Sequence, residues 1–211
     1  NNSGIQVGYL AGRYENRIGW LLSPGGWRKP PSWMKNVALD NGAFGAWTRG
    51  EDFNTEEWLK HIEKAHRECS NIVWQVVPDV VADKEKTLLQ WDNWAGTLKD
   101  KYPQTKLAIA VQDGMTKDDI KMAIQPDTIF VGGTTEWKWK NLKHWTTHFP
   151  GRVHVARVGS ERLLNMAHNA GAKSVDSTGF FRGGEERAEG LRRYLEETTN
   201  GKKQQQLELI K

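Results

Sequence analysis

The chain is poor in cysteine: Cys69 is the only one in 211 residues. A single cysteine cannot form an internal disulfide, and it cannot build a thiolate zinc site by itself. A protein that does not depend on disulfides suits a reducing compartment. We therefore expect a cytoplasmic protein.

Long apolar stretches are also missing. No apolar run approaches the roughly 20 residues needed to cross a bilayer, and the first residues, Asn1-Asn2-Ser3-Gly4, have neither the basic nor the apolar part of a signal peptide. Neither a membrane partner nor secretion is expected. Hydrophobic residues make up 37% of the chain, enough for one folded core, and 11 of them are tryptophans. The formal net charge of +4 permits a polyanionic partner without requiring one.

The signature motifs of several enzyme classes are absent from the sequence. It has neither a Gly-x-Gly-x-x-Gly dinucleotide fingerprint nor a Walker-type phosphate loop, so a nucleotide cofactor has no support. The six histidines include no His-Glu-x-x-His pattern, and no serine lies in a Gly-x-Ser-x-Gly elbow. We interpret the histidines as surface or packing residues and expect neither a metal nor another cofactor.

What the chain does have is a series of eight short apolar runs rich in β-branched residues. Most are continuous rather than alternating, which is typical of strands buried on both faces of a parallel sheet. The predicted strands are Ile5–Leu10, Ile18–Leu22, Asn36–Leu39, Ile72–Val77, Leu107–Val111, Thr128–Val131, Val153–Ala156 and Lys173–Val175. Helical periodicity and helix-start signals predict helices between several of them, over residues 55–68, 83–98, 116–123, 160–170 and 185–198.

This alternation predicts an α/β fold, a small (β/α)8 TIM-like barrel that residues 1–211 form as a single domain. A doubly wound open sheet is the alternative. The barrel is favoured because nearly every predicted strand is followed by a polar residue or a glycine, and the carboxyl ends of barrel strands converge on one site. Residues 199–211 include a polar, low-complexity stretch and are expected to form a helix end or a flexible tail.

Three aspartates, Asp40, Asp79 and Asp176, follow predicted strands. Two carboxylates placed close together have their pKa values pushed apart, so one can act as a nucleophile and the other as a proton donor. Glycosyl-transfer chemistry uses such a pair. Taken singly, each aspartate could equally cap a helix or fix a turn. Gly132-Gly133 follows another strand and would let the backbone approach a flat ligand, because no Cβ intervenes.

Five short segments at the strand ends occur in an order that matches one enzyme family. They are Leu39-Asp40-Asn41-Gly42-Ala43-Phe44, Val111-Gln112-Asp113-Gly114, Val131-Gly132-Gly133, Arg157-Val158-Gly159-Ser160, and Val175-Asp176-Ser177 with Arg182. In that order they resemble the Asp-Ser-Gly-Gly-Phe, Val-Gln-Gly-Gly, Ile-Gly-Gly, Gly-Val-Gly-Thr and Phe-Asp-Cys segments of the tRNA-guanine transglycosylases. The resemblance spans residues 39–182.

This resemblance implies base exchange on a nucleic acid. Asp176 would attack C1′ of the target nucleoside, and Asp40 would manage protons on the departing and entering bases. The guanine-like base would be held by Asp79, Gln112, Gly132, Gly133, Arg157 and Phe44. Arg182 would contact phosphate, and an unstacked strand would be supported by the interleaved aromatic and basic side chains of Trp137, Lys138 and Lys140.

One departure changes the expected partner. The tRNA enzymes carry a Cys-x-Cys-x2-Cys zinc subdomain after the nucleophile strand, whereas residues 185–211 contain no cysteine. The chain thus resembles the zinc-less phage and bacterial branch, which replaces guanine in DNA by a 7-deazaguanine such as preQ0. DNA is the expected partner, with tRNA as the alternative, in the cytoplasm of a bacterium or a phage-infected host. An N-glycosidase that uses water, and a non-catalytic barrel that binds a nucleobase or DNA, stay open.

Overall fold

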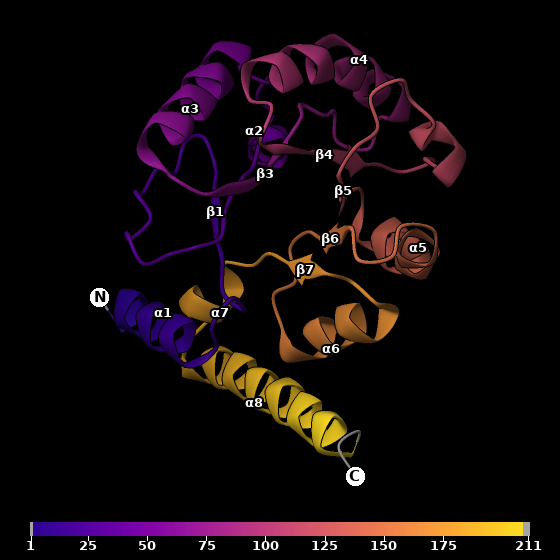
Figure 1. Ribbon diagram of the computed structural model, residues 1–211. Helices are drawn as coiled ribbons and strands as arrows, with labels where there is room; N and C mark the ends of the chain where they lie inside the picture. Colours follow the sequence, from indigo (N-terminus) through magenta and orange to yellow (C-terminus); the bar gives the residue numbers. More distant parts are fainter. Residues whose placement is uncertain (1, 209–211) are drawn as a thin grey trace.

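The computed structural model describes residues 2–208, and side chains from residue 6 to residue 199. Within residues 2–208, seven parallel strands follow one another in chain order and curl into a half-barrel, with eight α-helices around it (Figure 1). The strands are β1 (Trp20–Leu22), β2 (Val37–Leu39), β3 (Ile72–Val76), β4 (Lys106–Val111), β5 (Thr128–Val131), β6 (Val153–Val155) and β7 (Ser174–Val175). The predicted α/β class is therefore confirmed.

The helices lie mostly on the outside of the curl. They are α1 (Asn2–Arg13), α2 (Ala43–Arg49), α3 (Thr55–Glu68), α4 (Lys84–Lys101), α5 (Thr135–His148), α6 (Glu161–Ala170), α7 (Gly179–Arg182) and α8 (Glu185–Glu208), together with one 3-10 turn, η1 (Lys117–Ile120). The predicted helices at α3, α4, α6 and α8 are confirmed, whereas the one over 116–123 is reduced to η1. Of the predicted tail, residues 199–208 continue α8 and residues 209–211 lie outside the described residues.

The predicted eighth strand is wrong, because the segment Ile5–Leu10 lies inside α1. Val7, Leu10 and Tyr14 are spaced three and four residues apart, which places them on one helical face. Leu10 and Tyr14 are buried, and Val7 packs against the same core. The helical period therefore prevails over the β-branched composition of this run.

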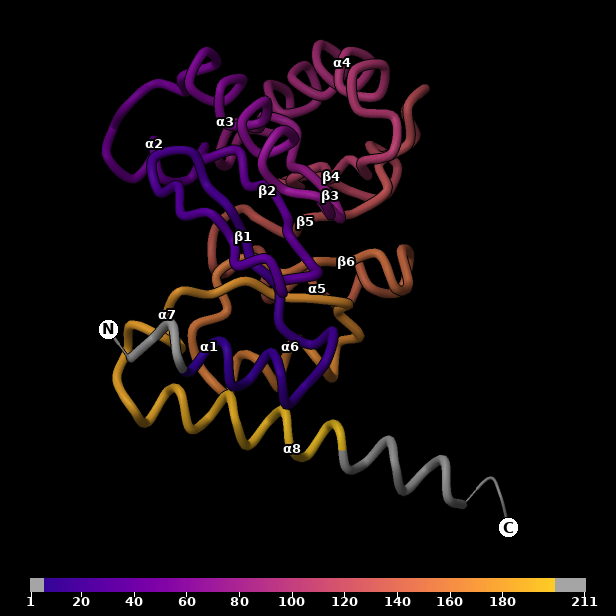
Figure 2. The backbone as a smooth tube through the Cα atoms, turned by 60° about the vertical axis from the view of Figure 1, so that its left-hand side comes forward, coloured from indigo at the N-terminus to yellow at the C-terminus, as the bar shows by residue number. Residues whose placement is uncertain are grey.

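The barrel is consequently not closed. Within residues 2–208, β1 pairs only with β2 and β7 only with β6. Helices α1 and α7 lie side by side where the two edge strands fail to meet, and α8 runs past both (Figures 1 and 2). The end of α1 is tied to α8 by an ion pair between Arg13 and Glu196 at 3.5 Å. A hydrogen bond of 2.9 Å from Arg17, in the loop that follows α1, to Thr198 holds the same contact.

The two faces of the sheet carry separate apolar clusters. Toward the helices, Leu107, Ile109 and Val111 of β4 join a large core that also holds the fully buried indoles of Trp58, Trp91 and Trp145. Toward the inside of the curl, the alternate positions Ala108 and Ala110 of β4 form a smaller cluster with Val76, against which the aromatic rings of Trp74 and Phe130 pack. The alanines of β4 leave room for these rings. None of the helices described is both long and apolar enough to cross a membrane.

The helical state of α1 predicts the response of Gly12, which is exposed and has no atom within 4 Å of an added Cβ. Gly12→Ala should raise the free energy of unfolding by about 0.5 to 1 kcal/mol, because alanine is the better helix former. Urea denaturation measures the change. Gly12→Val is the matched control and should gain less than alanine. A larger gain from valine would indicate a strand here and contradict the assignment.

Candidate active site

Each of the seven strands delivers a polar group or a glycine pair at its carboxyl end. In strand order these are Ser23, Asp40, Asp79, Gln112, Gly132-Gly133, Arg157 and Asp176. Because all strands are parallel, their carboxyl ends lie at the same edge of the curled sheet. Ser23 is a member that the sequence analysis missed, although it follows its strand in the same way.

Asp79 is held by two side-chain amides. Its two carboxyl oxygens accept from Asn41 Nδ2 and from Gln112 Nε2, each at 2.6 Å. Neither side-chain amide can be flipped, because each amide oxygen already accepts a backbone N–H. Asn41 Oδ1 accepts from Ala43 at 2.9 Å, and Gln112 Oε1 accepts from Gly133 at 3.1 Å. Asp79 is therefore held as a double acceptor.

The surroundings of Asp79 bring its titration near neutrality. Burial raises the pKa of Asp79 to about 7, against the hydrogen bond from Asn41, which lowers it. The negative charge of Asp40 raises the pKa of Asp79 further, and the positive charge of Arg157 lowers it. The pKa of Asp79 thus responds to Asp40 after β2 and to Arg157 after β6. Both strand ends therefore lie near Asp79 in the curled sheet.

Asp40 and Asp176 follow β2 and β7, far apart in the order of the sheet, yet the charge of one acts on the other. Burial raises the pKa of Asp40, and the negative charge of Asp176 raises it further. A hydrogen bond of 3.1 Å from Ser23 Oγ to Asp40 Oδ2 acts in the opposite direction. Asp40 therefore holds a proton more readily than an ordinary aspartate.

Asp176 accepts hydrogen bonds that fix its orientation. The backbone N–H of Arg157 lies 3.2 Å from both carboxyl oxygens, and His154 Nε2 lies 3.1 Å from Oδ1. The side chain of Asp176 keeps 20% of its surface exposed, so a ligand can reach it. It is an oriented acceptor at an open position.

His154 is a site residue that the sequence analysis missed, since the histidines were interpreted as surface or packing residues. It is 3% exposed, stacks on Phe130 at 5.0 Å and meets the edge of Trp74 at 4.9 Å. Its Nδ1 lies 2.8 Å from Ser174 Oγ, while its Nε2 faces Asp176. The available signal was one polar residue alternating with two valines in β6, which points it to the concave face.

Lys138 lies behind the site rather than on the surface, where a contact with a nucleic-acid strand was expected. It is 2% exposed, and its Nζ donates to the carbonyl of Ala156 at 2.5 Å. The same peptide group carries the Arg157 N–H that donates to Asp176. Burial lowers the pKa of Lys138 to about 8, as does the charge of Arg157, while Asp176 opposes both. Lys138 thus holds the peptide that orients Asp176.

The side chain of Arg157 reaches across the site. Its Nη2 donates to the carbonyl of Gly133 at 2.5 Å, and its guanidinium carbon lies 3.9 Å from the centre of the Phe44 ring. Gly133 adopts φ +68°, and an added Cβ would lie 2.6 Å from Asp113 Oδ2. Both the conformation and the close approach require glycine at position 133.

The remaining candidates lie further from the carboxylates. Arg182 ends α7 and Lys140 lies on α5, both exposed and both without a side-chain hydrogen bond or ion pair among the described residues. Trp137 is half-buried and packs against Trp145 at 6.3 Å. Of the predicted strand-contacting residues, Trp137 thus lies beside Gly133 and Lys138 lies behind Asp176, whereas Arg182 and Lys140 make no such contact among the described residues.

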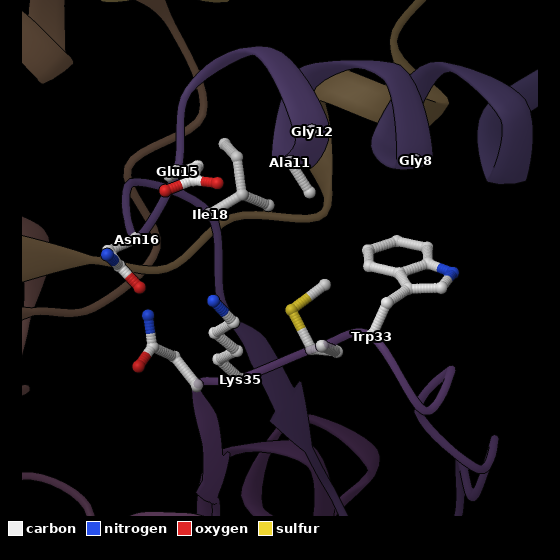
Figure 3. A pocket seen from close by; sticks show the side chains of 10 residues that line it. Gly8, Ala11, Gly12, Glu15, Asn16, Ile18, Trp33 and Lys35 are labelled. Carbon is white, nitrogen blue, oxygen red and sulfur yellow. The ribbon is translucent and has the colours of Figure 1, made fainter.

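A separate cavity of about 500 Å³ lies at the opposite end of the sheet (Figure 3). It is bounded by α1 and by the segments that precede β1 and β2, with Trp33, Glu15 and Lys35 among its lining residues. The amino ends of parallel strands contribute mainly to stability in such folds. Among the described residues, no cluster of three or more His, Cys, Asp or Glu side chains is placed to hold a metal ion.

Comparison with known proteins adds no relative: no family model matches the chain, and no curated protein matches it.

Asp79 is expected to make the free energy of unfolding depend on pH. Its pKa of about 7 lies above the ordinary value of 3.8, so between these values the folded state binds the proton more tightly than the unfolded chain. The stabilisation is complete below the ordinary pKa and is lost as the pH rises towards 7. The total change is roughly 4 kcal/mol at most. Urea denaturation at a series of pH values measures it.

The control for this titration is Asp92→Asn, on the exposed side of α4, which should keep the wild-type slope. Asp79→Asn removes the titrating group and should flatten the slope. It should also lower stability at low pH, because an amide would face the Gln112 amide donor to donor. An unchanged slope in Asp79→Asn would contradict the assignment of the titration to this residue.

Proposed function

We propose that this chain is a base-exchange transglycosylase, which replaces guanine in DNA by a 7-deazaguanine base of the preQ0 type. The observation that carries the proposal is that the negative charge of Asp176, after β7, acts on Asp40, after β2, while the two carboxyl groups have different hydrogen-bond partners. Pairs of carboxyl groups with divergent environments are the pattern of glycosyl transfer, in which one acts as nucleophile and one as acid and base.

Asp176 suits the part of the nucleophile. An oxygen of its carboxylate attacks C1′ of the target nucleoside, the bond from C1′ to the base nitrogen breaks, and the electron pair leaves with guanine. Asp40, whose pKa is raised, supplies the proton to the departing base. In the second half, the entering base attacks C1′, the ester to Asp176 breaks, and Asp40 takes the proton back.

The neighbouring groups suit the recognition of a flat base. Asp79 and Gln112 form a fixed, buried pair of carboxyl and amide groups, and the Gly133 carbonyl, which Arg157 now occupies, is an acceptor that a base could take over. The ring of Phe44 is 38% exposed beside them and offers a stacking surface. A base inside a duplex must leave the stack before its C1′ becomes accessible.

The choice of DNA rests on the resemblance of the strand-end segments to the transglycosylases and on the lack of a cysteine-rich zinc segment. Exchange of guanine in tRNA for another base would use the same residues, and it is the second candidate. An N-glycosidase would need only water as the acceptor. A binding protein without catalysis would leave the pairing of Asp40 with Asp176 unexplained.

The test traps the covalent intermediate. Wild type mixed with guanine-containing DNA and then denatured should yield an adduct with the mass of protein plus DNA less one guanine, and labelled guanine should enter the DNA. Asp176→Asn should form no adduct and should lose exchange by at least about 1,000-fold. Asp40→Asn should slow exchange by roughly 100- to 10,000-fold. The control is Asp100→Asn, an exposed position on α4.

Each alternative gives its own result. Abasic sites without incorporation of label indicate an N-glycosidase, and an adduct with tRNA alone indicates the tRNA reaction. DNA or base binding with neither adduct nor exchange indicates a non-catalytic barrel. Full exchange by Asp176→Asn would overturn the proposal.

A further inference from the structure

Arg157 has a backbone conformation that arginine rarely adopts. Its φ is +60°, in the left-handed region where a Cβ crowds the following carbonyl and where glycine alone is free of strain. Besides Asn16 and Ala82, it is the only residue other than glycine in this region among the described residues. A strained residue persists where its surroundings hold it, and such residues gather at ligand sites. Arg157 is therefore a candidate ligand-site residue, and the contacts of its side chain indicate which ligand.

That side chain fills the space between the base-binding groups. The guanidinium lies over the Phe44 ring at 3.9 Å and donates to the Gly133 carbonyl at 2.5 Å. The negative charges of Asp176 and Asp79 act favourably on it, and burial disfavours its charged form. A flat cation thus occupies a niche between an aromatic face and a backbone carbonyl, within the field of two carboxyl groups.

The niche is chemically suited to one class of planar group. A guanidinium is a flat carbon bonded to three nitrogens whose N–H groups point outward in the plane. The N1–H and 2-amino edge of guanine is similarly flat around C2, with N–H donors on two of the three nitrogens and no net charge. The Phe44 ring and the Gly133 carbonyl, which contact the guanidinium, could stack on and accept from this edge as well.

We propose that Arg157 is a resident plug, whose guanidinium occupies the niche that the N1–H and 2-amino edge of a guanine-type base takes, so that a base enters only when the side chain swings out. The identity of the base rests on the proposed function, but the plug itself does not. The alternative role is the one expected from the sequence, a direct contact from Arg157 to the bound base. The two roles predict opposite signs when the side chain is removed.

Arg157→Gly removes the plug and suits the left-handed backbone, and Arg157→Ala is the second variant in case glycine loosens the loop. Equilibrium binding of labelled guanine should be at least 10-fold tighter for both variants than for wild type. N-ethylguanidinium at low millimolar concentration should refill the niche and raise the Tm of both variants by a few degrees, but not that of wild type. The control is Arg152→Ala, which removes a guanidinium 5.5 Å from the Phe149 ring, outside the site.

The outcomes separate the plug from the proposed function. Weaker guanine binding by both variants would overturn the plug and make Arg157 a base contact. A rise in Tm with N-ethylguanidinium, but no guanine binding by any form, would support the plug and count against guanine exchange. If neither probe distinguishes the variants from wild type, the plug is wrong. In wild type, the NMR signal of Arg157 Nε–H should shift when guanine binds, a readout that needs no substitution; no shift despite binding would also overturn the plug.

Discussion

The action of the Asp176 charge on Asp40 is the interaction on which the rest of the account depends. The two residues end β2 and β7, which are separated by four other strands. In a flat parallel sheet, with strands about 4.8 Å apart, they would lie some 24 Å from each other, too far for one charge to affect the other appreciably in a screened medium. Only the curl of the sheet brings them together. The β4 alanines of its concave face, Ala108 and Ala110, are compatible with that curl.

Around this pair, the polar side chains of the site are themselves held in place by hydrogen bonds from neighbouring groups. Asn41 and Gln112 hold Asp79, and backbone N–H groups hold the two amides in turn. Lys138 binds one side of a peptide group whose other side orients Asp176. Such support keeps acceptors in place without relying on flexible surface side chains. It also gives the buried Lys138 ammonium a hydrogen-bond acceptor, the Ala156 carbonyl, in the favourable field of Asp176.

Much of this arrangement could be predicted from local sequence patterns. Continuous β-branched runs indicated the seven strands, and the polar residues that follow them indicated the edge at which a site could form. Strand closure could not be predicted in the same way, because pairing of β1 with β7 is a contact between distant parts of the chain. Ile5–Leu10 was assigned wrongly because its composition suits a strand, while the spacing of Val7, Leu10 and Tyr14 suits a helix. His154 and Lys138 were missed in their roles, since only the fold shows which neighbours they reach.

The most direct test of the central claim is the carboxyl ¹³C NMR titration of Asp40, in wild type and in Asp176→Asn. If the two side chains face one space, removing the negative charge at position 176 lowers the pKa of Asp40, which stays above the ordinary 3.8 because burial still raises it. An identical pKa of Asp40 in both proteins would show that the two carboxyl groups do not interact. That result would contradict both the common site at the strand ends and the mechanism proposed for it.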